Sequence, residues 1–247
     1  MPLKIDVRAF LSRCLGRWAR RLAPAAADRS GAAPVDTPAG RDENRDMGVI
    51  GIPLPVKLIV GMLARQADRL EQARRRLEEA FGPVDLASEP MDFDATDYYE
   101  REMGRPLVRQ FLAFERLIRP EELAAIKLRT NQMEMELVGQ TTTTPMSTSP
   151  TGETPRAASL PGVLRPRVVN IDPGYVTPGK LVLASTRGFA HRVYLGQGIF
   201  AEVTLMFMHG RWVSHACTFP DYASGRYDAF LGRVRDRLKQ QQREAPP

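Results

Sequence analysis

The chain has 247 residues, 43% of them hydrophobic, which is enough for one or two domains with a sizeable core. Its formal net charge is +6, but residues 1–46 hold nine Lys and Arg against six Asp and Glu, so half of the excess lies there. The rest of the chain is only mildly basic, and aromatic residues make up just 7% of the sequence. This balance argues against a dedicated nucleic-acid-binding protein.

The cysteine, histidine and hydropathy patterns exclude several further classes. Cys14 and Cys217 show neither the pairing of a disulfide framework nor the C-x-x-C spacing of a zinc site, and with three histidines a His-rich metal site is not expected. The longest apolar run, around residues 58–64, is far shorter than the roughly 20 residues of a membrane helix. We therefore expect a cytoplasmic protein without an integral membrane segment.

Residues 1–46 form an extension that precedes the main domain. Apolar residues at near-helical spacing, with arginines among them, lie between residues 3 and 22, and this pattern fits a basic amphipathic helix that contacts a membrane surface or a partner. We favour the alternative of a disordered leader, or of a segment upstream of a true start codon at Met47. The reason is that residues 21–46 have the Pro, Gly, Ala and charge mixture of disordered chains.

The first half of the domain has the order strand, helix, strand, strand, helix, strand. The segments are an apolar strand at 56–63, a helix ending before Gly82-Pro83, a strand at 84–93 with Pro90 at an edge or bulge, a strand at 107–118, a helix from Pro120, and a strand at 168–171. This order predicts an α+β fold of the ferredoxin-like type.

The second half follows a segment rich in Thr, Ser and Pro at residues 140–166. We interpret this segment as a flexible insert within one domain that spans 47–240, and a linker between two domains is the alternative. Strand patterns at 180–185, 191–195, 198–208 and 212–219 then predict an antiparallel β-meander that extends or faces the first sheet. An amphipathic C-terminal helix from Tyr227 to Leu238 completes the domain.

Five stretches carry a resemblance to a known family: KLIVGML, FGPVDLASEPMDFDATDYYEREMG, VNIDPGYVTPGKLVLAST, HRVYLGQGIFAEVTL and TFPDY. In this order they resemble the bacterial family called domain of unknown function 4416, over about residues 55–238 apart from the insert. The resemblance implies no activity, because none is established for the family. Some similar families carry a GTP-binding label, but no G-x-x-x-x-G-K-[ST] phosphate loop is present here.

The candidate site consists of ionisable residues in apolar or turn-rich surroundings. We expect His191 and Glu202 to move a proton, and Arg192 to bind a phosphate or carboxylate. Strand alternation over residues 199–206 predicts that Glu202 and Leu205 point to different faces of the strand, with Glu202 among bulky neighbours. The expected ligand-binding residues are Asn170, Asp172, Tyr175, Lys127, Arg192 and Asp221, and no metal ligands are expected. Residues 172–175 are interpreted as a turn that shapes the rim of the site.

The same residues also fit a purely structural interpretation. In it, Arg192 pairs with Glu202 across a hairpin, Asp172 accepts N–H bonds of a turn, and Asp221 ends a strand. Lys127 and Glu134, which lie on one stripe of the predicted helix, then form an exposed helix edge.

Two functions follow from these alternatives. The first is a domain that binds a small anionic ligand, either a nucleotide or a phosphorylated metabolite, and carries out acid/base chemistry on it. The sequence does not decide whether this domain is an enzyme. The second is a non-enzymatic module that recruits protein, membrane or RNA through the N-terminal helix and the insert. The sequence identifies neither a cofactor nor an oligomeric state.

Overall fold

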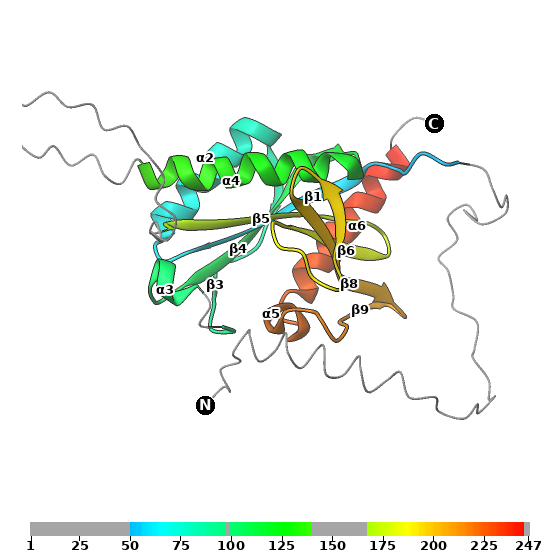
Figure 1. Cartoon of the computed structure of the whole chain (residues 1–247). Coiled ribbons are helices and arrows are strands. Elements are labelled where there is room, and N and C mark those ends of the chain that lie inside the picture. Colours follow the sequence, from blue (N-terminus) through cyan, green and yellow to red (C-terminus); the bar gives the residue numbers. More distant parts are fainter. Residues whose placement is uncertain (1–49, 97–98, 140–166, 245–247) are drawn as a thin grey trace, which may run out of the picture.

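The structure is a computed structural model (Figure 1). It describes residues 50–96, 99–139 and 167–244. The extension at 1–46, with the helix expected at 3–22, and the insert at 140–166 lie outside the described residues. The expectations for these segments stay predictions.

The described residues form an α+β structure built on one nine-stranded antiparallel sheet. The strand order is β2-β4-β1-β5-β6-β8-β7, and β3 pairs with β4 and β9 with β8. Residues on both sides of the insert thus contribute to the same sheet. The strands are β1 (Val56–Ala64), β2 (Val84–Ala87), β3 (Met91–Asp92), β4 (Val108–Ile118), β5 (Val169–Val176), β6 (Lys180–Ser185), β7 (Val193–Gly196), β8 (Ile199–Met208) and β9 (Arg211–Val213).

Helices cover both faces of this sheet. The long helices α2 and α4 lie together on one face, here called the α2/α4 face, and α6 crosses the other, the α6 face (Figure 1). The helical segments are α2 (Ala67–Phe81), α3 (Glu100–Met103), η1 (Pro120–Glu122), α4 (Leu123–Gly139), α5 (Pro220–Ala223) and α6 (Asp228–Glu244). As predicted, α2 ends before Gly82, whose φ of 93° favours glycine, and before Pro83.

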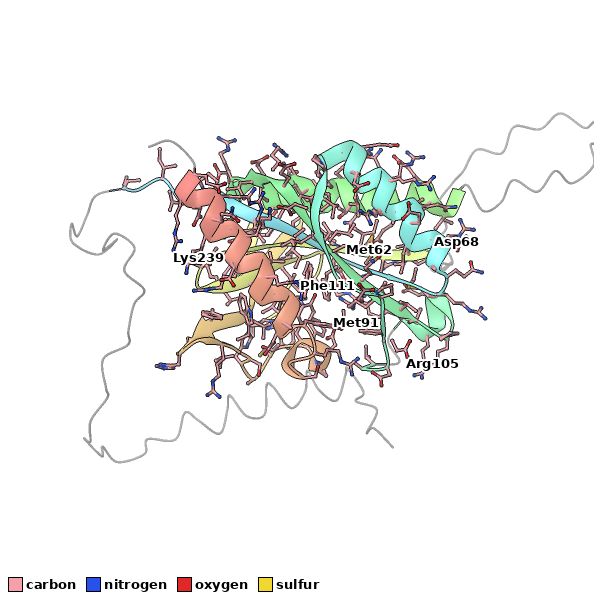
Figure 2. The ribbon with its side chains drawn as sticks, turned by 180° about the vertical axis from the view of Figure 1, so that it is seen from behind. Met62, Asp68, Met91, Arg105, Phe111 and Lys239 are labelled. Atoms are coloured by element: carbon pink, nitrogen blue, oxygen red, sulfur yellow. The ribbon has the colours of Figure 1, made fainter. Side chains whose placement is uncertain are left out.

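Strand β1 is the centre of the core, and all of its residues are buried. Successive side chains of a strand point to opposite faces, so Leu58 and Val60 pack on the α2/α4 face while Ile59 packs on the α6 face. On the α6 face, the ring of Phe111 lies 4.7 Å from that of Tyr227 and 6.0 Å from that of Phe230. Figure 2, seen from behind, shows α6 crossing this side of the sheet near Phe111.

The second half of the sheet is antiparallel, but it is not the predicted meander. Strand β6 pairs with β8 and not with β7, and β7 and β9 both pair along the other edge of β8. The strand expected at 212–219 ends at Val213, and Pro220 begins the short helix α5. Asp221 therefore lies in a first helical turn, where carboxylates are favoured, and the expectation that it ends a strand is wrong.

The turn predicted at residues 172–175 is also wrong, because these residues lie inside β5. Pairing of β5 with β6 begins at Gly174 opposite Leu183, and residues 169–173 pair with β1 alone. Pro173 lies outside the segment of β5 that pairs with β6. Its missing N–H therefore removes no hydrogen bond between β5 and β6. At Gly174, a Cβ atom would lie 2.3 Å from the carbonyl oxygen of Val182, so glycine permits the close approach of the two strands.

The substitution Gly174→Ala tests this close approach. We expect a loss of about 3 kcal/mol in the free energy of unfolding, because the new methyl group overlaps the backbone of β6. Gly179→Ala is the matched control, since nothing lies within 4 Å of a Cβ there. Urea denaturation measures both, and equal midpoints for Gly174→Ala and the unsubstituted protein would contradict the described contact.

Candidate functional site

The structure divides the predicted site residues into separate groups. His191, Arg192 and Glu202 meet at β8 and are here called the Glu202 group. Lys127, Asn170 and Asp172 meet at β5 and are called the Asp172 group. Asp221 contacts neither group directly and pairs with Arg109. Tyr175 lies on β5 and is half-buried.

The Glu202 group is held by one buried carboxylate. Oε2 of Glu202 accepts a hydrogen bond of 2.7 Å from Nε of Arg192 and lies 3.0 Å from Nε2 of His191. Burial alone would raise the pKa of Glu202, but the bonds from His191 and Arg192 outweigh it and lower that pKa. Nη1 of Arg192 also donates to the carbonyl oxygen of Arg187. The Arg192–Glu202 pair of the structural interpretation is therefore present.

One ring nitrogen of this group has no hydrogen-bond partner among the described residues. Because Nε2 of His191 faces the Glu202 carboxylate, this nitrogen carries a proton, and Nδ1 is left buried without a hydrogen bond among the described residues. His215 differs, since its Nδ1 accepts from the backbone of Cys217 and its Nε2 lies 2.5 Å from the carbonyl oxygen of Val203. Both nitrogens of His215 are occupied, whereas His191 retains one acceptor.

An open hollow of about 440 Å³ borders the Glu202 group. It borders residues 202–205 of β8, whose edge away from β6 has no strand partner in the described part of the chain, because β7 pairs with residues 199–201 and β9 with residues 206–208. This space is called the Glu202 hollow. Its lining residues are Tyr175, Lys180, Val182, His191, Val193, Ala201, Glu202, Val203, Met206 and His215.

A bulge in β8 changes the predicted alternation. Val203 lies opposite Val182, but Leu205 lies opposite Leu181, so Thr204 is the extra residue. Glu202, opposite Leu183, therefore shares the α6 face with Leu205, which the sequence analysis placed on the other face. The bulky neighbours of Glu202 predicted a partly buried carboxylate, and its side chain is in fact buried, at 3% exposure.

The Asp172 group closes the open edge of β5. Nζ of Lys127 donates to the carbonyl oxygen of Ile171 at 2.9 Å, and Oε1 of Glu134 accepts from the backbone N–H of Ile171 at 2.6 Å. Two side chains of α4 thus occupy the positions that a neighbouring strand would fill. Lys127 and Glu134 are buried, so the interpretation of an exposed helix edge is wrong for both.

Asp172 receives hydrogen bonds from side chains and not from a turn. Nδ2 of Asn170 donates to its Oδ2 at 2.5 Å, and Nζ of Lys127 lies 3.3 Å from its Oδ1. Burial would raise the pKa of Asp172, but the charges of Lys127 and Arg109 outweigh it and lower that pKa. At Glu134, by contrast, burial outweighs the charges of Lys127 and Arg167 and raises the pKa to about 7.

Arg109 is a central residue that the sequence analysis missed. It is 3% exposed, and its guanidinium lies 4.8 Å from the ring centre of Phe93 and 3.8 Å from Oδ2 of Asp221. Burial raises the pKa of Asp221 even though Arg109 opposes the shift. A sequence signal existed, because Arg109 alternates with Phe111 and Ala113 on one face of an apolar strand.

The described residues show neither a metal-binding cluster nor a membrane-spanning helix. No group of three or more His, Cys, Asp or Glu side chains there is placed to hold a metal ion. Within the same part of the chain, no helix is long and apolar enough to cross a membrane.

Comparison with known proteins gives a family but no activity. The family model described as "Domain of unknown function (DUF4416)" matches residues 54–144 and 159–238. No curated protein and no solved structure matches the chain.

The raised pKa of Glu134 predicts a pH dependence of stability. The folded state binds the Glu134 proton more tightly than the unfolded state, so this contribution is complete below about pH 4.5 and is lost as the pH rises through about 7. Relative to Glu134→Gln, the unsubstituted protein should lose up to about 3 kcal/mol between about pH 5 and pH 8.

Urea denaturation across this pH range measures the difference. Glu136→Gln is the matched control on the same helix, because Glu136 is a third exposed and pairs with Arg76 and Arg129. A constant stability difference between Glu134→Gln and the unsubstituted protein at every pH would contradict the assignment.

Proposed function

We propose that this chain, which belongs to the DUF4416 family, binds a small anionic ligand in the Glu202 hollow and exchanges a proton with it. The observation that carries the proposal is the free Nδ1 of His191, whose other ring nitrogen is fixed by Glu202. An imidazole that a carboxylate orients through one ring nitrogen is an arrangement suited to a general base.

Positive charge around the hollow supports an anionic ligand. Lys180 lines the hollow, and Arg192 lies beside His191 within the Glu202 group. A phosphate or carboxylate bound in the hollow would be attracted by the ammonium group of Lys180.

The chemistry assigns one role to each residue of the Glu202 group. Nδ1 of His191 takes a proton from a hydroxyl group of the ligand or of a water molecule, and the Glu202 carboxylate stabilises the imidazolium that forms. Arg192 holds the carboxylate in position. Since Nδ1 is buried, ligand contact requires movement of the groups that cover it.

We also propose that part of the sheet is a ferredoxin-like unit. The expectations for further binding residues, localisation and partners stay predictions. The antiparallel order β2-β4-β1-β5, with α2 and α4 on one face, supports a ferredoxin-like unit to which β6–β9 are added. Roles for Lys127, Asn170, Asp172 and Asp221 in binding the same ligand stay predictions. So do cytoplasmic localisation and recruitment of partners through residues 3–22 or the insert.

Thermal-shift measurements with named anions test the proposed function. Inorganic phosphate, adenosine 5′-monophosphate and glucose 6-phosphate are compared with sodium chloride at equal ionic strength. A ligand at 100 times its Kd stabilises the folded state by about 2.7 kcal/mol, and we expect at least one of the three to raise the Tm.

The substitution His191→Asn should weaken that binding about tenfold or more, because it removes the free nitrogen. His209→Asn is the matched control, since His209 is an exposed histidine in the β8–β9 turn. The proposal fails if none of the anions stabilises the protein, or if His191→Asn and His209→Asn bind equally well.

A further inference from the structure

The Glu202 hollow has two chemically different parts. Its charged part lies at the open edge of β8, where His191 and Glu202 are found. Its other part lies on the α2/α4 face of the sheet and is made mainly of apolar side chains. These are Tyr175, Val182, Val193, Ala201, Val203 and Met206, with Lys180 among them.

Cross-strand pairing places this apolar part on one continuous face. Tyr175 lies opposite Val182, and Val182 lies opposite Val203. Val193 lies opposite Ala201 on the next strand along. Residues directly opposite in antiparallel strands project to the same side, so the surface spans four strands from β5 to β7.

Helix α4 covers only part of this face. Leu123, at the start of α4, packs with Val182, Ala184 and Ile199. Further from the helix, Val193 is 68% exposed and Val203 is 37% exposed. An apolar surface that carries a lysine, Lys180, matches a ligand with an apolar body and an anionic head.

We infer that the ligand of the Glu202 hollow is an amphiphilic anion, with its anionic head beside Lys180 and its apolar body along Val203 and Val193. This inference rests on the proposed function and specifies its ligand class. The volume of about 440 Å³ lies within the range of about 300–1,000 Å³ that small-molecule sites occupy. A purely polar anion would leave the apolar part of the hollow unused.

A series of carboxylates tests the inference by isothermal titration calorimetry. Acetate, butyrate, hexanoate and octanoate share one head, and their tails lengthen by two methylene groups at each step. Complete burial of a methylene strengthens binding about fourfold, so in this open hollow we expect about twofold for each methylene. Octylamine and 1-octanol, which have eight carbon atoms like octanoate but no carboxylate, should bind at least about tenfold more weakly than octanoate.

Substitutions on the exposed valines locate the tail. Val193→Ser and Val203→Ser should each weaken octanoate binding about threefold and leave acetate and phosphate binding unchanged. Met135→Ser is the matched control, because Met135 is an exposed apolar residue on α4 away from the hollow. Val193 is largely exposed, so its substitution is compatible with folding.

The possible outcomes separate the two proposals. If phosphate or acetate binds but the affinity is independent of tail length, the amphiphilic ligand is wrong and the proposed function stands. If no anion binds, the proposed function is wrong and the inference fails with it. If 1-octanol binds as tightly as octanoate, the anionic head is wrong. If the valine substitutions instead dissociate a dimer, a second copy of the chain covers this face.

Discussion

The structure depends on how the edge of β5 is completed between Val169 and Pro173. Strand β1 pairs with this segment on one side, and no strand in the described part of the chain pairs with it on the other. The polar backbone groups of Ile171 are instead bonded to Lys127 and Glu134 from α4. A buried peptide group without a partner costs about 1–3 kcal/mol, so these two side chains are required for β5 to lie where it does.

This arrangement explains why charges collect in the core. Lys127 reaches past the edge of β5 to Asp172 on the α6 face, and Arg109 and Asp221 lie on that face as well. β6 pairs with β5 only up to Leu183, which lies opposite Gly174. The last residues of β6, Ala184 and Ser185, therefore pair with β8 alone. In Figure 1, β5 lies across the view, whereas the antiparallel strands β6 and β8 are steeply inclined to it. The Glu202 hollow lies on these diverging strands, at a separate open edge.

The sequence predicted those elements whose signals are local. The β1 segment is an apolar run, and α2 has a helical apolar stripe that ends at Gly82-Pro83, so both were found close to their observed bounds. The Arg192–Glu202 pair was also found, because Arg192 directly precedes β7 and Glu202 lies on β8, the neighbouring strand of the hairpin. Burial of Glu202 followed from the apolar residues beside it in the sequence.

The errors share a non-local cause. Pro173-Gly174 resembles a turn unless one knows that β6 leaves β5 at Pro173 and approaches closely at Gly174. The pairing of β6 with β8, and the bulge at Thr204, depend on strand partners and not on composition. Arg109 was missed because its burial comes from α5 and from aromatic rings distant in the sequence.

Hydrogen exchange at the Ile171 amide tests most directly whether α4 completes the edge of β5. If the hydrogen bond of 2.6 Å to Glu134 protects this amide, it exchanges slowly in the unsubstituted protein and at least about tenfold faster in Glu134→Ala. The amide of Leu63 in β1 serves as an internal reference. Equal exchange rates for Ile171 in the two proteins would contradict the account.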